Sequence, residues 1–237
     1  ACIDFFAKNR IAADNFAHAL TKNLFAYPLQ ALQASWNLLG SHDTERFMTA
    51  CGGDERKAAL AAVFVMTWGG MPLVYYGDEI GMEGDNDPDC RRPMIWERGG
   101  ENGTARSGRR WNEQLFQLYK RLIQLRRDMA ALRRGEARIV HADPVTNTIV
   151  YRRGYERDGV YIALNNSPRT QEVPTDVVLG SSQQGAAAGT QNAHKGALSL
   201  TVLLDGSDGI RFESDASETV STVIRVPPYG AVMLTRS

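Results

Sequence analysis

The fold of this chain is decided by residues 36–46, which read WNLLGSHDTER, and by residues 70–81, which read GMPLVYYGDEIG. Each segment contains a short apolar run that ends at a glycine, a pattern typical of a buried β-strand. We expect strands over residues 35–39 and 73–76. Between them, an alanine-rich apolar run follows Asp54, which predicts a helix with an acidic N-cap. Strand, helix and strand with short connections predict a βαβ unit whose strands are parallel.

A second helix is predicted to begin at Asn112. Its apolar residues recur at the spacing of one helix face: Leu115, Leu118, Tyr119, Leu122, Ile123 and Leu125. Basic residues near its end, Arg126 and Arg127 among them, are predicted to face solvent and the helix C-terminus.

The pattern changes after Arg134. Candidate strands with a period of two cover residues 138–142, 148–153, 160–165, 198–204, 220–226 and 231–234. Turn residues between most of them predict an antiparallel β-sandwich, in which the Gly- and Ser-rich residues 180–196 form a loop. We therefore expect two units, residues 1–134 of α/β character and residues 135–237 built of strands.

Composition argues against several classes of protein. The chain has 27 basic and 27 acidic residues, and this zero net charge gives no reason to expect nucleic acid or a membrane surface as partner. No apolar run approaches the roughly 20 residues that a membrane span needs. The spacing of Cys2, Cys51 and Cys90 fits neither a disulfide framework nor a zinc site, and reduced thiols favour a cytoplasmic location.

Polar residues follow both predicted strands, over residues 41–46 and 77–92. Parallel strands end at one edge of a sheet or barrel, so we expect both segments on the same rim, where such folds carry their active sites. His42 and Asp43 could bind hydroxyl groups or handle protons there. Alternatively, Asp43 caps a short helix and His42 bonds to the backbone, and the residues alone leave both interpretations open.

Residues 85–96 begin like a calcium-binding loop, with aspartates at alternate positions. The match fails at Cys90, where the loop needs glycine, and at Trp96, where it needs a bidentate glutamate, so no metal site is predicted. Asp87 and Arg91 could instead present hydrogen-bond acceptors and donors to a neutral polyol. The other interpretation is a surface ion pair that contributes little to stability.

Aromatic residues near the second strand also allow two interpretations. Tyr75, Tyr76 and Trp96 could stack on a sugar ring, but aromatic residues beside a buried strand more often belong to the core. Glu79 could be a structural carboxylate that accepts hydrogen bonds from backbone amides.

Three ordered motifs resemble a known enzyme family. Residues 36–44 resemble the late signature of the α-amylase superfamily, glycoside hydrolase family thirteen. Residues 70–81 resemble that family's eighth barrel strand and the loop after it. Residues 86–96, which read NDPDCRRPMIW, are similar to the neopullulanase and cyclomaltodextrinase branch. The resemblance covers about residues 1–180 and is only topological beyond them.

The resemblance implies the end of a (β/α)8 TIM barrel, with strands seven and eight and their helices, followed by an antiparallel β domain. It implies that Asp43 is the acid that stabilises the transition state and that His42 is a neighbouring hydroxyl-binding residue. Asp87 and Arg91 then hold a glucose unit further along the glycone side. The implied substrate is an α-glucan or maltooligosaccharide, and no cofactor is implied.

The departures from the family pattern are as informative. A retaining glycosidase needs a nucleophile and an acid/base carboxylate about 5 Å apart. In the family these come from strands four and five, which would precede Ala1, and the first methionine is Met48. We expect a piece of a longer protein that is inactive, and over residues 1–134 unstable, without a missing N-terminal barrel half. The segment over residues 98–110 is longer and more polar than the connection between strand eight and helix eight that the resemblance implies.

Two other functions remain open. A non-catalytic carbohydrate-binding module would present exposed aromatic residues on one face of the β domain. The candidates there are Tyr151, Tyr155, Tyr161, Tyr229 and Phe212, and Tyr151 and Tyr161 fit core positions. A catalytically inactive family relative that acts as a scaffold is the third interpretation.

Overall fold

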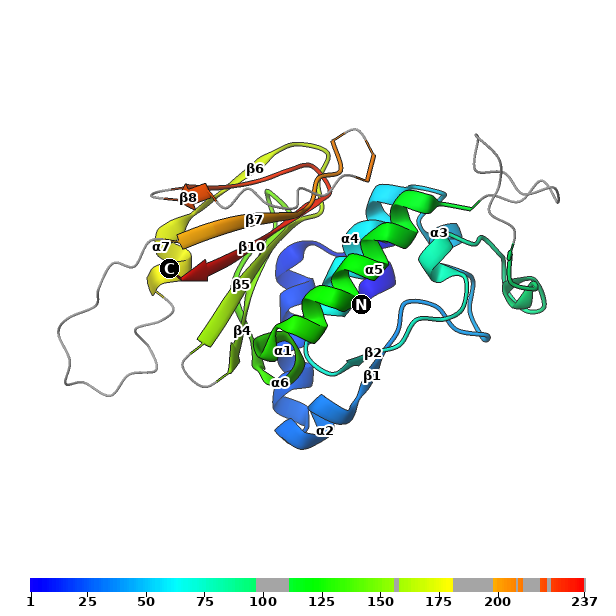
Figure 1. Ribbon diagram of the computed structural model, residues 1–237, viewed down its shortest axis with the longest axis horizontal. Helices are drawn as coiled ribbons and strands as arrows, with labels where there is room; N and C mark the ends of the chain where they lie inside the picture. The colour runs from blue at the N-terminus through cyan, green and yellow to red at the C-terminus, as the bar shows by residue number, and fades with distance from the viewer. Residues whose placement is uncertain are drawn as a thin grey trace.

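The computed structural model describes residues 1–96, 111–155, 158–180, 198–207, 209–210, 218–220 and 223–236. Helices and two short strands form the first part of the chain, and a large sheet forms the second (Figure 1). Within these ranges no helix is long and apolar enough to cross a membrane. Of the loop predicted over residues 180–196, Gly180 belongs to a helix, and residues 181–196 lie outside the described residues, as does the polar segment at residues 98–110.

The first part of the chain contains most of the helices. They are η1 (Ile3–Ala7), α1 (Ala13–Ala26), α2 (Leu29–Ala34), α3 (Phe47–Ala50), α4 (Glu55–Thr67), η2 (Asp78–Ile80), η3 (Asp89–Arg91), α5 (Glu113–Asp128) and α6 (Ala130–Arg134). The predicted N-cap of α4 is confirmed, and α5 begins next to Asn112, where the second helix was predicted to start. Asp54 accepts from the Arg56 amide at 3.1 Å, and Asn112 accepts from the Leu115 amide at 2.9 Å.

The two short strands are parallel, as the sequence predicts, but the second begins earlier than expected. In β1 (Trp36–Asn37) and β2 (Met71–Pro72), Trp36 pairs with Met71 and Asn37 pairs with Pro72. The strand predicted over residues 73–76 is wrong. After one further bond, from the Leu73 amide to the Asn37 carbonyl, the chain turns, because the Tyr75 carbonyl accepts from the Asp78 amide at 3.0 Å.

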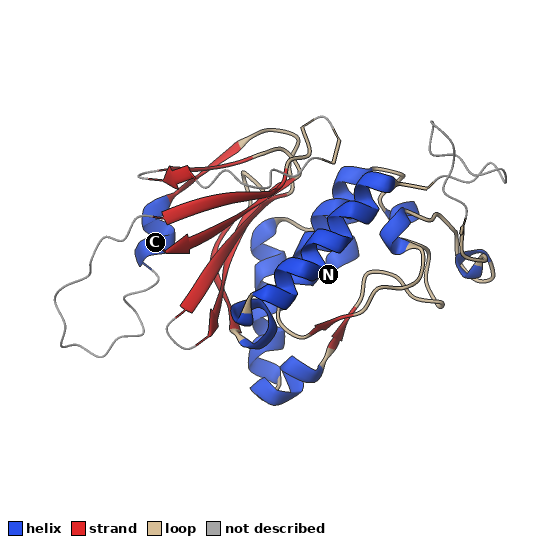
Figure 2. Ribbon diagram, in the orientation of Figure 1, coloured by secondary structure: helices blue, strands red, loops and turns tan. Residues whose placement is uncertain are grey.

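The second part contains two antiparallel sheets (Figure 2). The larger has the strand order β3-β4-β5-β10-β7-β8. Its strands are β3 (Glu136–Asp143), β4 (Thr148–Tyr155), β5 (Asp158–Asn165), β7 (Leu198–Leu204), β8 (Glu218–Val220) and β10 (Gly230–Arg236). The smaller pairs β6 (Gln171–Pro174) with β9 (Val223–Val226). Helix α7 (Thr175–Gly180) follows β6. The single strand predicted over residues 220–226 is therefore two strands, β8 and β9, in different sheets.

The larger sheet is buried on both faces. Alternate residues point to opposite sides, so Val150 and Tyr161 pack with Val173 of β6 and Ile224 of β9. Ile149 and the other residues in phase with it face the helices instead. The sheet is thus a middle layer, with the β6–β9 pair on one face and α4 on the other.

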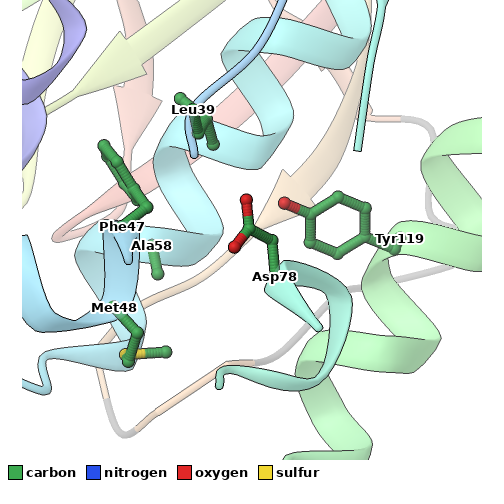
Figure 3. Close-up of a pocket in the computed structure, with 6 residues that line it drawn as sticks. All are labelled: Leu39, Phe47, Met48, Ala58, Asp78 and Tyr119. Carbon is green, nitrogen blue, oxygen red and sulfur yellow. The ribbon is translucent and has the colours of Figure 1, made fainter. Parts of the chain in front are cut away.

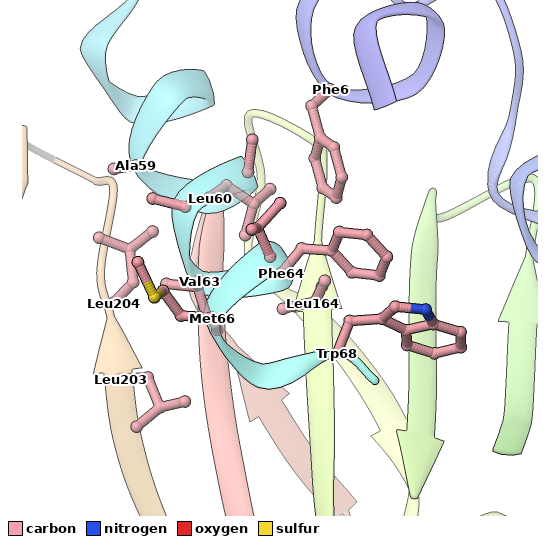
Figure 4. Close-up of a cluster of buried hydrophobic side chains, with 14 of the residues drawn as sticks. Phe6, Ala59, Leu60, Val63, Phe64, Met66, Trp68, Leu164, Leu203 and Leu204 are labelled. Carbon is pink, nitrogen blue, oxygen red and sulfur yellow. The ribbon is translucent and has the colours of Figure 1, made fainter. Parts of the chain in front are cut away.

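Helix α4 joins the two parts into one hydrophobic core. Its residues from Ala58 to Thr67 are all buried, as expected for a helix that is apolar on every side. Phe64 and Leu60 belong to the same cluster as Leu164 of β5 and Leu204 of β7 (Figure 4). A division at residue 134 therefore does not separate two cores.

Arginine side chains bind the backbone at the end of α4. Arg126 donates to the carbonyls of Met66 at 2.8 Å and Trp68 at 3.1 Å, so its predicted placement in solvent is wrong. From the sheet, the buried Arg153 donates to the Thr67 carbonyl and, at 2.8 Å, to the Gly135 carbonyl. These donors satisfy carbonyls that a helix C-terminus leaves without intrahelical partners.

Candidate active site

The segments that follow β1 and β2 lie against each other, as the βαβ prediction requires. We call residues 38–46 the first loop and residues 73–92 the second loop. The Arg46 amide donates to the Gly84 carbonyl at 2.8 Å. The His42 carbonyl accepts from Arg91 Nε at 3.0 Å and from Cys90 Sγ at 3.3 Å. Both loops therefore form one rim at the end of the parallel pair.

The structure brings together all the site residues that the sequence predicts. Arg91 lies between two carboxylates: its Nε is 3.0 Å from Asp87 Oδ1 and its Nη2 is 3.6 Å from Asp43 Oδ1. His42 Nε2 is 3.3 Å from the same Asp43 oxygen. The interpretation of Asp43 as a helix cap is wrong, because α3 has Arg46 at its N-cap position and no side-chain cap.

The rim cluster, defined as His42, Asp43, Asp87 and Arg91, is open to solvent. Its side chains are between 48% and 70% exposed. Ion pairs this exposed contribute little to folding stability, and the contact between Asp87 and Arg91 is the surface ion pair that the second interpretation predicts. The cluster offers carboxylate acceptors beside guanidinium and imidazole donors, a set suited to a ligand rich in hydroxyl groups.

The turn that carries Asp87 and Arg91 is shaped by its neighbours. The Asp89 carboxylate accepts from the Asp85 amide at 2.7 Å and is paired with Arg92 Nε at 2.5 Å. The carboxylates of Asp87 and Asp89 therefore bind protein groups. Across the described part of the chain, no group of three or more His, Cys, Asp or Glu residues could hold a metal ion.

Beneath the rim lies a buried charged pair that sequence reasoning missed. The Arg46 side chain is fully buried, with Nη1 3.5 Å from Asp78 Oδ1. Burial raises the pKa of Asp78 to about 7, and the charge of Arg46 opposes that rise only in part. The available signal was positional, since both residues follow the predicted strands on the same rim. Glu79 has the structural role suggested above, because it accepts from the Gly77 amide at 2.7 Å.

A small cavity lies next to Asp78. It is lined by Leu39, Phe47, Met48, Ala58, Asp78 and Tyr119 (Figure 3). The cavity volume is about 10 Å³, which is room for one water molecule and not for a sugar. The Asp78 carboxyl and the Tyr119 hydroxyl point toward each other (Figure 3). Burial, followed by the nearby Asp78 and Glu79 charges, raises the pKa of Tyr119.

Of the three candidate aromatic residues, Tyr75 and Tyr76 pack against other residues of the rim, and Trp96 is exposed. Tyr76 donates its hydroxyl to the Arg92 carbonyl at 2.8 Å, and its ring lies 4.7 Å from that of Tyr75. Both rings also lie over the Arg46 guanidinium. Trp96 is 80% exposed and remains available to a ligand.

Comparison with known proteins agrees with this architecture. The family model described as "Alpha amylase, catalytic domain" matches residues 3–135. This chain belongs to the α-amylase family. The family match includes both loops and every residue of the rim cluster.

Relatives within the family are glycoside hydrolases by name. Neopullulanase 2 of Thermoactinomyces vulgaris is 49% identical over 171 residues, 72% of this chain and 28% of the relative. Cyclomaltodextrinase of Geobacillus thermopakistaniensis is 38% identical over 233 residues, 98% of this chain and 34% of the relative. The chain thus spans about a third of the length of these curated relatives.

A solved structure shows the same similarity over the whole chain. The cyclic α-maltosyl-(1→6)-maltose hydrolase of Arthrobacter globiformis, in complex with cyclic α-maltosyl-(1→6)-maltose, has a TM-score of 0.72 and 25% identity. The match covers 99% of this chain and 42% of that structure. The sheet part, which lies outside the family model, therefore also has a counterpart in this relative.

Proposed function

We propose that this chain forms the last part of the catalytic (β/α)8 barrel and the C-terminal β domain of a retaining α-glucan hydrolase. The domains would be residues 1–134 and 135–237, and the bonds cleaved would be α-1,4 and possibly α-1,6 glucosidic. The observation that carries the proposal is the rim cluster, in which the predicted residues of two loops meet at the end of parallel strands. Family membership and the names of the relatives support it.

In this proposal Asp43 stabilises the transition state. Its carboxylate accepts hydrogen bonds from sugar hydroxyls beside the reacting carbon, and these bonds strengthen as positive charge develops on the ring. His42, with Nε2 3.3 Å from Asp43, binds a neighbouring hydroxyl. Asp87 and Arg91 hold a glucose unit further along the chain of sugars. Because Arg91 contacts both carboxylates, it also fixes how Asp43 and Asp87 are oriented.

The nucleophile and the acid/base are assigned to another part of the barrel. A retaining mechanism needs two carboxylates about 5 Å apart in addition to the stabilising acid. Asp43 and Asp87 both pair with Arg91, and we give neither of them these roles. We propose that strands outside this sequence supply both groups, so the chain alone has no hydrolase activity.

An exposed apolar surface around the parallel pair supports the same proposal. Large hydrophobic side chains are exposed on β1, β2 and the segments beside them: Phe25, Tyr27, Leu29, Trp36, Leu38, Met71 and Val74. Trp36 is 66% exposed although it lies within a strand. Exposed apolar surface and an unpaired strand edge together are unfavourable in water. The remaining barrel strands would cover both.

The deciding experiment compares the chain alone with the chain joined to an N-terminal barrel half from a family relative. Hydrolysis of maltodextrin, cyclomaltodextrin and pullulan is measured for both. We expect turnover only by the joined protein, with Asp43→Asn reducing kcat by roughly 100-fold or more. Arg91→Lys should weaken kcat/KM by about tenfold, because a compact ammonium lacks the rigid planar fork with which the guanidinium reaches both carboxylates. Turnover by the chain alone would refute the assignment of the missing carboxylates.

The alternative of a carbohydrate-binding module finds less support. Among the described residues, Tyr151 and Tyr161 are buried in the two clusters of the core, and Tyr229 is also buried. Tyr155 packs at the edge of the larger cluster, and Phe212 lies outside the described residues. The scaffold interpretation stays a prediction that the same activity assay would test.

A further inference from the structure

Arg46 is the charged residue whose burial is hardest to explain by stability. A guanidinium removed from water is costly unless its donors are all satisfied. Here Nε and Nη2 have no hydrogen-bond partner among the described residues, and Asp78 Oδ1 likewise has none. An ion pair at 3.5 Å with these donors unused is a weak source of folding energy.

The contacts of Arg46 are unusual in a second respect, because nearly all of them go to the second loop. Nη1 donates to the Tyr76 carbonyl and lies 3.5 Å from Asp78. The guanidinium lies 4.2 Å from the Tyr75 ring centroid and 4.5 Å from that of Tyr76. Its own amide donates to the Gly84 carbonyl at 2.8 Å. One residue of the first loop therefore holds the second loop from its beginning to its middle.

Asp78 makes the reciprocal contact, from the second loop to the first. A Cβ added to Gly40 would lie 2.7 Å from Asp78 Oδ2, so the carboxyl is packed directly against the glycine that ends the first strand segment. Gly40 lies three positions before Asp43, and Arg46 lies three positions after it. The backbone that carries His42 and Asp43 is thus bracketed by contacts with Asp78 on one side and from Arg46 on the other.

We propose that Arg46 is a positioning residue, which together with Asp78 sets the first loop relative to the second and so sets the geometry of the rim cluster. The proposal rests on the proposed function of that cluster as a sugar-binding site. It concerns arrangement only, because Arg46 is buried and touches no substrate. Its rigid planar fork, stacked on two rings, defines direction in a way that a lysine cannot.

The test replaces the pair with uncharged groups of similar shape, Arg46→Met with Asp78→Asn, in the 237-residue chain. Removing both members of a buried ion pair often leaves stability unchanged, so the urea unfolding midpoint should stay close to that of the parent. Hydrogen exchange is then followed at the amides of residue 46, which bonds to Gly84, and of Gly84, which bonds to Thr49 Oγ1. We expect exchange at both amides to become at least tenfold faster while α4 amides keep their protection.

The matched control is Val173→Ala, which removes buried volume from the cluster on the far face of the sheet, a cluster that contains no residue of either loop. It should lower the unfolding midpoint and leave the relative protection of amides 46 and 84 unchanged. Unchanged exchange at both amides in the double variant would overturn the proposal. So would faster exchange that is matched across α4, because that would be a loss of stability only.

If the double variant does not fold, Arg46→Lys carries the test. It keeps a positive charge beside Asp78 and removes the stacked fork, so faster exchange confined to amides 46 and 84 is expected, and parental exchange overturns the proposal. In the joined protein the same variants should lose at least tenfold in kcat. If the joined protein without substitutions shows no turnover, the proposed hydrolase function is refuted. The hydrogen-exchange result does not depend on turnover, so it still tests the positioning role of Arg46.

Discussion

At the scale of single residues, Asp78 predicts how stability should depend on pH. Burial raises its pKa from the ordinary 3.8 to about 7 in the folded protein, with Arg46 opposing and Glu79 reinforcing the rise. The folded state therefore binds this proton more tightly than the unfolded state between pH 4 and 7. The contribution of Asp78 to stability is largest below pH 4 and falls as pH rises through 7.

Asp78→Asn removes this titration. Its urea unfolding free energy should vary less between pH 5 and 8 than that of the parent, and the variant should gain a few kcal/mol relative to the parent by pH 8. Parallel curves for the two proteins would show that the buried carboxyl titrates normally. Glu79→Gln, which keeps an oxygen acceptor for the Gly77 amide, serves as the control.

The same scale shows what sequence could and could not reveal about the site. His42 and Asp43 were accessible because polar residues directly after parallel strands gather at one rim. Asp87 and Arg91 lie well beyond β2, and the resemblance to the α-amylase family gave their roles. Arg46 and Asp78 are placed at the same rim by their positions after the predicted strands, but the burial of this pair was not accessible. Pattern reasoning assigns charged residues to the surface, and burial of this pair depends on how two loops pack, which no local period encodes.

At the scale of elements, Gly40 makes a sharp prediction about how the first loop meets the second. Gly40→Ala places a methyl group 2.7 Å from Asp78 Oδ2 and 3.1 Å from Oδ1. Overpacking of this kind costs about 1–3 kcal/mol of unfolding free energy. Gly69→Ala is the matched control, since its added Cβ would meet the Ala137 Cβ at an ordinary 3.6 Å.

Asp78→Ala should rescue Gly40→Ala, because it removes the atoms that the new methyl group meets. A double-mutant cycle with urea unfolding measures that coupling. Additive effects of the two substitutions would mean that the two residues are not in contact.

Elements with strong local signals were predictable, and these include strands β3, β4, β5, β7 and β10 as well as two helices. Short strands whose extent depends on their pairing partner were not predictable. Helices α4 and α5 begin where Asp54 and Asn112 cap them. Strand β2 was misplaced because its extent depends on how far β1 runs beside it. Strand β6 was missed altogether, since Gln171–Pro174 is short and has a single buried apolar residue, and its register comes only from β9.

At the scale of the whole molecule, the shared core predicts that neither part is stable by itself. A fragment of residues 1–134 would expose the side of α4 that packs on β5, β7 and β10, in addition to the open parallel pair. A fragment of residues 135–237 would expose Ile149, Ile162 and Leu164 of the sheet. We expect both fragments to aggregate or to unfold without a cooperative transition, as measured by sedimentation and circular dichroism.

The full chain of 237 residues is the control for both fragments, because it keeps the packing of α4 on the sheet. It should be more stable than either fragment, although residues 1–134 are still expected to need the missing barrel half for full stability. A monomeric 1–134 fragment with a sharp transition would contradict the prediction. Sequence indicated the change from helices to strands at residue 134 because the hydrophobic period changes there. It gave no sign that the core continues across it, since packing of α4 on the sheet links residues far apart along the chain.

The hydrogen bonds from Arg126 and Arg153 to carbonyls at the end of α4 have a consequence for how such proteins diversify. Those carbonyls lie immediately before β2, and β2 leads into the loop with Asp87 and Arg91. The start of the second loop is therefore held partly from the sheet. We expect that exchanging the C-terminal sheet for an unrelated one would shift the start of this loop. The two parts should therefore be inherited and recombined as a single module.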